Sequence, residues 1–326
     1  MEEMSAERRR QQTARQEQAA RAAWLYYIAG RTQDEIATQL NISRQAAQRL
    51  VSRAVAEKLI KFRFDHPIGP CMELSRALTE RYALGFCDVV PHTGPGDDPL
   101  PGIAIAGAQY LERWFGQRAP LVIGLSTGRT LRAIAAEVSP VEAPQHKVLS
   151  LCGTISQTGR AITTDPVMRL AERTGAQCFP MPAPVVASSI EERRLLHMQR
   201  SFQVLRDLAE QARCVMLGVG HIGWLSPLHQ DGFVSDLELT ELIEAGAVGE
   251  IAGQCFDARG RMVQSSVSER VAGLKLPANP RCIRVGVAGG SAKVAPLHAA
   301  LIGRLINGLI TDEVTATRLL QEHPAS

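Results

Sequence analysis

The chain has 326 residues, of which 45% are hydrophobic, 21% charged and 5% aromatic. At roughly 150 residues per domain this length predicts about two domains, and the composition excludes a short peptide, a small disulfide scaffold and an extensively disordered chain. No apolar run approaches the roughly 18 residues of a membrane span, and the N-terminal stretch has no signal-peptide character. We therefore expect a cytoplasmic protein with no membrane contact.

The formal net charge of +3 is unevenly distributed along the chain. Residues 1–64 contain 12 Lys and Arg against 7 Asp and Glu, whereas the rest contains 24 against 26. A basic head favours contact with a polyanion, although a solvated helical face is the simpler explanation. The seven cysteines are scattered, with no CxxC pair and no histidine at metal-ligand spacing. We therefore expect reduced thiols, no metal site and no cofactor.

The basic head has the spacing of a helix-turn-helix motif. Residues 16–29 form helix readily and are followed by a glycine, which is typical of a helix end. Thr32 and Glu35 can form a capping box at the start of a short second helix. Asn41 tolerates the left-handed backbone of a tight turn, and Ser43 is a strong N-cap for a third helix.

The third helix, which we expect to end near Leu59, has two contrasting faces at 100° per residue. Ala47, Leu50 and Ala54 share an apolar face, and long polar side chains lie opposite. An ordinary surface helix would also have such a face, but the capped helices and the turn in a basic segment favour a recognition helix in a major groove. The residues that we expect to contact double-stranded DNA are Thr32, Gln33, Ser43, Arg44, Gln45, Gln48, Arg49 and Arg53.

Two further segments bear on the domain organisation. Residues 60–64, IKFRF, alternate apolar and basic side chains and predict a wing strand beside the motif, with an edge strand as the alternative. Residues 66–70 contain two prolines and a glycine and mark the expected boundary. We predict a DNA-binding domain over residues 1–66 and a second domain over residues 67–326.

The second domain alternates short apolar runs with helical stretches. LVIGLS precedes TLRAIAAEV, KVLSLCG precedes VMRLAERTG, CVMLGVG precedes a loop, and CIRVGVAGG precedes a long helix. This alternation predicts a Rossmann-like α/β domain with a mainly parallel sheet. Ligands bind at the carboxyl ends of the strands in such sheets, so we expect function in the turns that follow them.

The first of these turns, residues 126–130 (STGRT), offers hydroxyls, a glycine, backbone N–H groups and one cation at the start of a helix. It can cradle a phosphate. The alternative is a glycine that serves helix packing beside an arginine in solvent. The loop lacks the GxxxxGK[ST] pattern, so nucleoside triphosphate binding is not expected.

Other turns add candidate ligands. Lys293 follows a Gly-Gly-Ser turn and lies in the first turn of the next helix. The helix dipole disfavours a cation there unless an anion neutralises it, which makes Lys293 a candidate anion ligand. The alternative is a side chain that extends into water. Gly220 allows close backbone approach, and we expect a structural role for His221. Glu250 and Asp257 bracket a strand that runs into a turn, where carboxylates can accept hydrogen bonds from sugar hydroxyls, although Asp257 also suits the turn itself.

Taken in order, these segments resemble the SorC family (SorC/DeoR group) of bacterial transcriptional regulators. The resemblance covers nearly the whole chain and rests on TQDEIATQLNISRQAAQRLVSRA, IGLSTGRTL, LCGTIS, LGVGHIG, GAVGEIAGQCFD, VGVAGGSAK and INGLITDEVTATRLL. It implies an N-terminal helix-turn-helix domain and an effector domain similar to sugar-phosphate isomerases and glucosamine-phosphate deaminases. Members are typically tetramers that bind operator DNA and respond to a sugar, a polyol or its phosphate.

The resemblance also implies roles for individual residues. The loop at 126–130 and Lys293 would hold the phosphate, Gly153 and Thr154 would line the pocket, and two carboxylates would meet hydroxyls. The full set of effector ligands is Ser126, Thr127, Gly128, Arg129, Thr130, Gly153, Thr154, Gly220, Glu250, Asp257 and Lys293. The family often has Trp where this chain has Thr127, which leaves the identity of the effector open.

We therefore predict an effector-responsive transcriptional regulator that acts as a homo-oligomer, a tetramer or a dimer. One alternative is an active sugar-phosphate isomerase or deaminase with a DNA-binding head. The glycine-rich turns contain no clear acid/base pair, although Asp257, Glu250 and His221 are candidates. The other alternative is a constitutive DNA-binding protein whose large domain serves only assembly.

Overall fold

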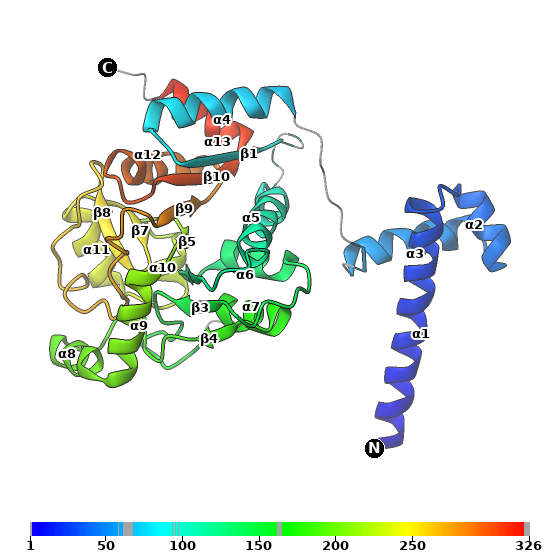
Figure 1. The fold of residues 1–326 in the computed structure, drawn as a ribbon, viewed down its shortest axis with the longest axis horizontal. Helices are drawn as coiled ribbons and strands as arrows, with labels where there is room; N and C mark the ends of the chain where they lie inside the picture. Colours follow the sequence, from blue (N-terminus) through cyan, green and yellow to red (C-terminus); the bar gives the residue numbers. More distant parts are fainter. Residues whose placement is uncertain are drawn as a thin grey trace. The chain divides into compact units, whose positions relative to one another are not determined.

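The computed structural model describes residues 2–57, 59–60, 68–92, 94, 96, 98–161 and 165–322, with side chains from residue 12 onward. The chain divides into two units, Met1–His66 and Pro67–Ser326 (Figure 1). The predicted wing at residues 61–64 lies outside the described residues. None of the described helices is both long and apolar enough to cross a bilayer.

The first unit consists of three helices: α1 (Glu2–Tyr27), α2 (Gln33–Leu40) and α3 (Arg44–Ala56). α1 begins well before the predicted start, because its first turns are made of helix-forming Glu, Arg, Gln and Ala without the apolar periodicity used for the prediction. α3 ends before the predicted Leu59. A helix, a short capped helix and a second capped helix are nevertheless present in the predicted order.

The caps of the helix-turn-helix are confirmed. The Thr32 amide donates to Glu35 Oε2 at 2.8 Å, and the Glu35 amide donates to Thr32 Oγ1 at 3.3 Å, which is a reciprocal capping box. Asn41 has a φ of 52°, in the left-handed region. Ser43 Oγ accepts a hydrogen bond from the Ala46 amide at 3.2 Å. These bonds fix where α2 starts and ends and where α3 starts.

Small residues allow α1 and α3 to pack closely. Ala19, Ala23 and Ala54 are fully buried together, and a neighbouring cluster buries Ile36 of α2. On α3 the buried residues are Ala47, Val51 and Ala54, whereas the predicted core residue Leu50 is only partly buried. The apolar face of α3 therefore turns toward α1 and α2 and leaves the opposite face to solvent.

The second unit is built on a seven-stranded sheet whose neighbouring strands all run parallel. The strand order is β1-β10-β9-β5-β2-β3-β4. The strands are β1 (Phe86–Val90), β2 (Val122–Leu125), β3 (Lys147–Ser150), β4 (Gln177–Phe179), β5 (Cys214–Gly218), β9 (Ile283–Val287) and β10 (Gly308–Asp312). The predicted parallel α/β sheet is confirmed, and four of its strands are those expected from the apolar runs.

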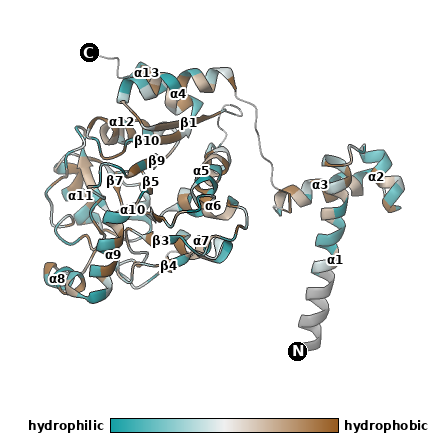
Figure 2. Cartoon of the chain, viewed as in Figure 1, coloured by the Kyte–Doolittle hydropathy of each residue, from teal (hydrophilic) through white to brown (hydrophobic). Residues whose placement is uncertain are grey.

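Helices cover both faces of this sheet, and strands and inward helix faces are apolar (Figure 2). The helices are α4 (Gly69–Tyr82), α5 (Leu100–Phe115), α6 (Arg129–Glu137), α7 (Pro166–Thr174), α8 (Ile190–Met198), α9 (Arg200–Gln211), α10 (Pro227–Gln230), α11 (Asp236–Glu244), α12 (Val294–Ile302) and α13 (Glu313–Gln321). One core packs α5, α6 and α7 on the sheet, and the other packs α4, α9, α12 and α13.

The helix expected after CIRVGVAGG is shorter than predicted. A 3₁₀ turn, Ser291–Lys293, comes first, and α12 ends before Gly303. The apolar stretch that follows does not continue the helix, because β10 begins at Gly308 and forms a fully buried strand. Continuous apolar sequence fits a buried helix and a buried parallel strand equally, so periodicity could not separate them.

A three-stranded antiparallel sheet lies beside the main one, with the order β6-β7-β8. Its strands are β6 (Gly220–His221), β7 (Ala247–Ile251) and β8 (Gln254–Asp257). The β7–β8 hairpin turns at Ala252 and Gly253, whose φ values of 53° and 82° are both positive, as in a type I′ turn. The sequence predicted the later turn at residues 257–260, which the structure confirms, but not this hairpin.

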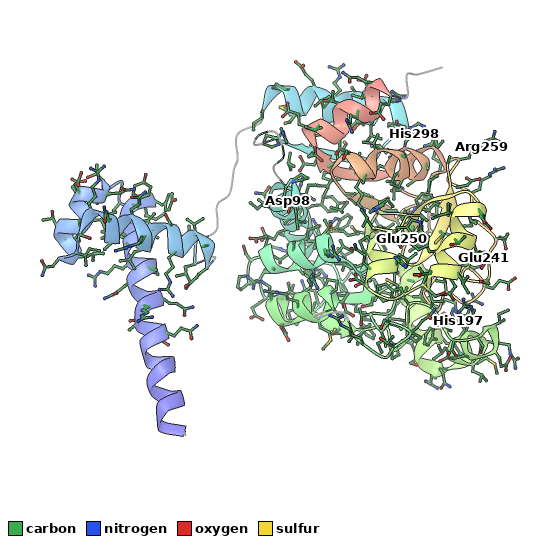
Figure 3. The ribbon with its side chains drawn as sticks, turned by 180° about the vertical axis from the view of Figure 1, so that it is seen from behind. Asp98, His197, Glu241, Glu250, Arg259 and His298 are labelled. Carbon is green, nitrogen blue, oxygen red and sulfur yellow. The ribbon has the colours of Figure 1, made fainter. Side chains whose placement is uncertain are left out.

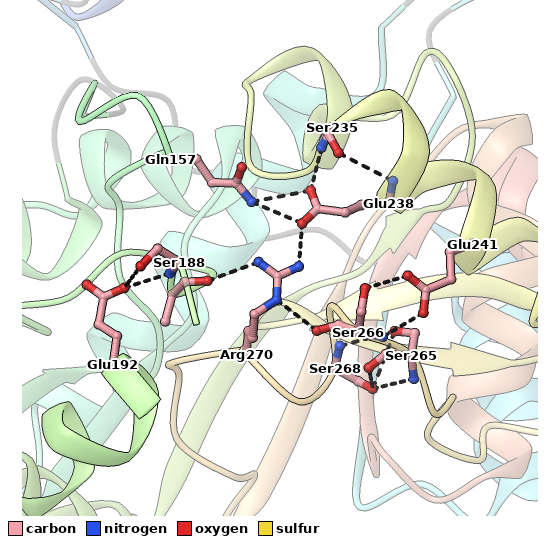
Figure 4. Close-up of polar contacts among 11 residues, drawn as sticks. Gln157, Ser188, Glu192, Ser235, Glu238, Glu241, Ser265, Ser266, Ser268 and Arg270 are labelled. Carbon is pink, nitrogen blue, oxygen red and sulfur yellow. Dashed lines mark hydrogen bonds and ion pairs between the residues drawn. The ribbon is translucent and has the colours of Figure 1, made fainter. Parts of the chain in front are cut away.

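A polar cluster fastens the loops beside this small sheet (Figure 4). Arg270 forms an ion pair with Glu238 of α11 and donates to the carbonyl oxygens of Ala187, at 3.1 Å, and Ser266, at 2.9 Å. The Ser235 amide donates to Glu238 Oε2 at 2.7 Å. One guanidinium thus joins three segments that are far apart in sequence, and α11 is held against the hairpin layer.

Candidate functional site

A cavity of about 450 Å³ lies at the carboxyl ends of the central strands. Its walls come from the loop after β2, from the turn between β5 and β6, from β7, and from the turn after β9. Residues between β6 and α11 form a further wall. Cavities of roughly 300–1,000 Å³ are typical of small-molecule sites, and this edge of a parallel sheet is where such ligands bind.

The loop after β2 presents a helix N-terminus to the cavity. Gly128 is the N-cap of α6, with a φ of 130° and no side-chain hydrogen bond to the first turn. Thr127, Arg129 and Thr130 also line the cavity. The amides of the first helical turn have no partners within the helix, and the helix dipole favours negative charge there. The loop therefore has the geometry of an anion-binding turn.

Ser126 has a different place. Its side chain is buried and does not line the cavity. The Gly218 amide donates to Ser126 Oγ at 3.0 Å, and the Ser126 amide donates to the Met216 carbonyl at 3.0 Å. Ser126 therefore ties the end of β2 to the end of β5 and positions the neighbouring loop.

Lys293 reaches the cavity from the 3₁₀ turn after β9. The Gly290 amide donates to Asp312 Oδ2 at 3.1 Å and to Thr315 Oγ1 at 2.8 Å, which fixes the turn that carries the lysine. Burial lowers the pKa of Lys293, and Glu250 partly restores it. An anion in the cavity would offset the cost of holding this ammonium group away from water.

Glu250 of β7 lies within the body of the second unit (Figure 3). Its Oε2 accepts a hydrogen bond from the Gly253 amide at 3.0 Å. The carboxyl group packs on the backbone of Gly220, where a Cβ atom would lie 2.3 Å from Glu250 Oε1. Burial raises the pKa of Glu250, while the Gly253 amide and Lys293 lower it. A side chain at position 220 would therefore displace the Glu250 carboxyl group.

His221 is a cavity residue for which the sequence favoured a structural role over ligand contact. It lines the cavity, and its Nδ1 lies 3.4 Å from Lys293 Nζ. Burial and the nearby lysine lower the pKa of His221. The sequence signal for a ligand role of His221 was its position at the end of a strand among glycines. A lone histidine at such a position predicts packing as readily as ligand contact.

Three more charged residues, Arg132, Arg160 and Asp231, line the cavity without having been predicted. Together with Lys293 and Arg129, the cationic side chains around the cavity outnumber the carboxylates of Glu250 and Asp231. Such a set of charges can bind a ligand that has both an anionic part and hydroxyl groups. Guanidinium groups bind phosphate oxygens in pairs, whereas carboxylates accept from hydroxyls.

Besides Ser126, three predicted ligands do not line the cavity. Gly153 is buried, and a Cβ atom there would lie 1.8 Å from the Ala183 carbonyl oxygen. Thr154 is partly buried beside it. Asp257 Oδ1 accepts hydrogen bonds from the Arg259 and Arg261 amides, both at 2.9 Å. These contacts fit the alternative of a turn-forming aspartate.

In the first unit, α3 displays the predicted polar face. Gln45, Gln48 and Arg49 are exposed on α3, opposite its buried side. Thr32 is exposed at its capping position and Gln33 is partly exposed. The remaining predicted contacts are Ser43, which caps α3, Arg44, which lies 3.5 Å from Asp34, and Arg53, which forms an ion pair with Glu57 at 2.5 Å.

Comparison with known proteins agrees with this arrangement. The model of the sugar-binding domain family matches residues 66–321. The erythritol catabolism regulatory protein EryD of Brucella abortus (strain 2308) is 33% identical over 302 residues, which cover 93% of this chain and 96% of the relative. The deoxyribonucleoside regulator of Bacillus subtilis (strain 168) is 29% identical over 313 residues, which cover 94% of this chain and 98% of the relative.

Solved structures share the fold. The full-length sorbitol operon regulator SorC from Klebsiella pneumoniae has a TM-score of 0.70 at 21% identity, and the match covers 93% of this chain and 98% of that one. A DeoR family transcriptional regulator from Listeria monocytogenes has a TM-score of 0.68 at 20% identity, with coverage of 77% and 99%. The chain joins a helix-turn-helix unit to a sugar-binding domain, and its relatives are regulators. This class of protein is a sugar-responsive transcriptional regulator, not an enzyme. The chain belongs to the sugar-binding domain family, and the resemblance to SorC-type regulators is confirmed.

Replacing Gly153 by alanine should destabilise the second unit. The new Cβ would collide with the Ala183 backbone, and such overpacking costs about 1–3 kcal/mol of unfolding free energy. Gly69→Ala is the matched control, because a Cβ there meets nothing within 4 Å. Urea unfolding followed by circular dichroism measures both. Equal midpoints for the two variants would show that Gly153 is not constrained by packing.

Sulfate binding to the cavity should tighten as the pH falls. In the ligand-free protein His221 has a lowered pKa, and a sulfate beside Lys293 would favour the imidazolium and raise that pKa. Binding then takes up a proton in the interval between the two pKa values, so affinity increases as the pH drops through it. Calorimetry from about pH 7.5 to about pH 5.5 covers the range in which a histidine titrates.

The matched variants for this titration are His221→Gln and His197→Gln. His197 also has a lowered pKa, but it contacts the Ala272 carbonyl and does not line the cavity. We expect His221→Gln to flatten the pH dependence and His197→Gln to preserve it. An unchanged pH dependence in His221→Gln would contradict this assignment.

Proposed function

We propose that this regulator binds operator DNA through α3 and is controlled by a phosphorylated sugar or polyol bound in the cavity of the second unit. It acts in the cytoplasm as a homo-oligomer, a tetramer or a dimer. The observation that carries the proposal is the placement of Lys293, His221 and Glu250 around one cavity that the N-terminus of α6 also lines.

The charges of the cavity support a phosphate ester over a neutral sugar. Lys293 is held partly away from water, and Arg129 lines the same cavity and helps to lower the pKa of Lys293. Two cations and a helix N-terminus around one space favour a dianionic group. Glu250 then remains to accept hydrogen bonds from hydroxyls of the same molecule. This division predicts that the phosphate binds at Lys293 and that hydroxyls bind at Glu250.

The relatives narrow the compounds to test. One is named for erythritol catabolism and another for deoxyribonucleosides. A four-carbon polyol phosphate and a pentose phosphate are therefore the first candidates for this chain. The cavity of about 450 Å³ has room for either.

The exposed face of α3 supports base readout. Gln45, Gln48 and Arg49 share that face, and Gln and Arg form paired hydrogen bonds to adenine and guanine edges. In a homo-oligomer, two such helices would read two half-sites whose spacing depends on the arrangement of the subunits. An effector changes DNA affinity only if it binds two such arrangements unequally.

The test of the proposed function is selection of genomic DNA fragments by the purified full chain. Each retained fragment is then titrated by fluorescence anisotropy with and without a panel of sugars, polyols and their phosphates. We expect a discrete fragment whose affinity is shifted by a phosphate ester. In Lys293→Ala the shift should be lost while DNA binding without effector is preserved. No retained fragment above background, or an unchanged effector midpoint in Lys293→Ala, would contradict the proposal.

Base readout has its own test in three alanine variants. Arg49→Ala and Gln45→Ala should each lose about 1–3 kcal/mol of discrimination between the selected fragment and a scrambled one. Arg53→Ala should weaken both complexes more evenly, because a flanking arginine is expected to contact phosphate. Anisotropy titrations at a fixed salt concentration measure all three variants. Unchanged selectivity in Arg49→Ala and Gln45→Ala would refute their assignment as base readers.

A further inference from the structure

Within the connection between β6 and α11, residues 223–232 form a short segment at one wall of the cavity. Gly223 and Gly232, at its two ends, have φ values of 157° and 74°, and a Cβ at either would meet nothing within 4 Å. Between them the chain forms α10, a helix of four residues. The segment therefore has a permissive, uncrowded glycine at each end.

One side of this segment faces the cavity and the other faces solvent. Leu225, Pro227, Leu228 and Asp231 line the cavity, although Leu225 is 77% exposed. His229 Nδ1 lies 3.2 Å from the Trp224 carbonyl oxygen, and its Nε2 lies 2.7 Å from Asp236 Oδ1 of α11. Leu228 is buried in a small apolar cluster with Phe233 and Leu239, which is separate from the two cores of the main sheet, whereas Leu225 stays exposed.

An ion pair connects this segment to the loop after β2. Arg129 Nη2 lies 3.5 Å from Asp231 Oδ1, and the two side chains are 56% and 32% exposed. An exposed pair at this distance is weak and readily exchanged for another partner. Both residues line the same cavity, so a ligand can reach both.

An anion in the cavity acts on the two partners in opposite directions. Phosphate or sulfate oxygens at the N-terminus of α6 offer Arg129 a paired set of acceptors, which a guanidinium binds better than one distant carboxylate oxygen. The same anion repels the carboxylate of Asp231, since like charges in a shared, partly desolvated space are disfavoured. A neutral polyol does neither.

We propose that an anionic ligand breaks the Arg129–Asp231 ion pair, which we call the latch. The anion binds Arg129, repels Asp231 and releases segment 223–232 from the cavity wall. This proposal rests on the anion site of the proposed function. Asp231 is then a residue that determines specificity, because only a charged ligand replaces Asp231 as the partner of Arg129. A phosphate ester and its neutral parent would then leave the protein in two different states.

Hydrogen–deuterium exchange of the full chain, followed by mass spectrometry, tests the latch. The probe is sodium sulfate, with sodium chloride at matched ionic strength and erythritol as the neutral control. Saturating sulfate should speed the exchange of amides 224–233 several-fold, and erythritol should not. Asp231→Asn should exchange at the faster rate without any anion and respond no further. Glu244→Gln, on the exposed side of α11, is the matched control and should behave as the wild type.

The outcomes separate the latch from the anion site. Wild-type exchange rates in Asp231→Asn without sulfate would overturn the latch, whatever sulfate does. Sulfate that binds by calorimetry but leaves amides 224–233 unchanged, or slows them, would overturn ligand-driven release while the proposed anion site stands. No calorimetric binding of sulfate would overturn the anion site and ligand-driven release together, and fast exchange in Asp231→Asn would then show only that the ion pair holds the segment.

Discussion

The reversal of strand order between β2 and β5 is the constraint on which the site depends. From β2 the chain adds β3 and β4 outward on one side, and from β5 it adds β9 and β10 on the other. Because all seven strands are parallel, their carboxyl ends lie at one edge, and the reversal leaves a crevice there. Ser126 holds the two strand ends together by accepting a hydrogen bond from the Gly218 amide. The loops on either side can then diverge around a ligand.

The cavity contains charges that are unfavourable without a ligand. Lys293 is partly desolvated, and the neighbouring His221 is held toward its neutral form. Glu250 offsets part of this cost, but its own burial opposes the charged form. Placing these groups together costs stability. Groups with perturbed pKa values tend to cluster at functional sites, which favours a functional role for this cluster. Under the proposed function, a ligand with both an anionic part and hydroxyl groups neutralises these charges.

Sequence reasoning succeeded where a local interaction determines the structure. The capping box of Thr32 and Glu35, the left-handed Asn41 and the Ser43 cap depend on neighbouring residues, and all are present. The parallel sheet was also predictable from repeated apolar runs and helices. β10 was missed because its apolar sequence is shared by helices and buried strands.

The site was only partly predictable for a related reason. The turns that carry Arg129 and Lys293 follow β2 and β9, and Glu250 lies near the end of β7; such strand ends can be located from sequence. Whether a side chain enters the cavity depends on tertiary contacts: Ser126 turns inward to bond β5, and Asp257 bonds its own turn. Asp231 lines the cavity from a segment in which the sequence indicated no ligand, and His221 lies in a glycine-rich turn that predicts packing as readily as ligand contact. Their roles follow from the fold and not from spacing.

The measurement that tests the central claim most directly is calorimetric titration of the full chain with a four-carbon polyol phosphate and with its unphosphorylated parent. The account predicts that the ester binds roughly tenfold or more tightly than the parent, a difference of about 1.4 kcal/mol or more, because only the ester engages Lys293 and the N-terminus of α6. Equal affinity for the two compounds, or tighter binding of the neutral parent, would contradict it.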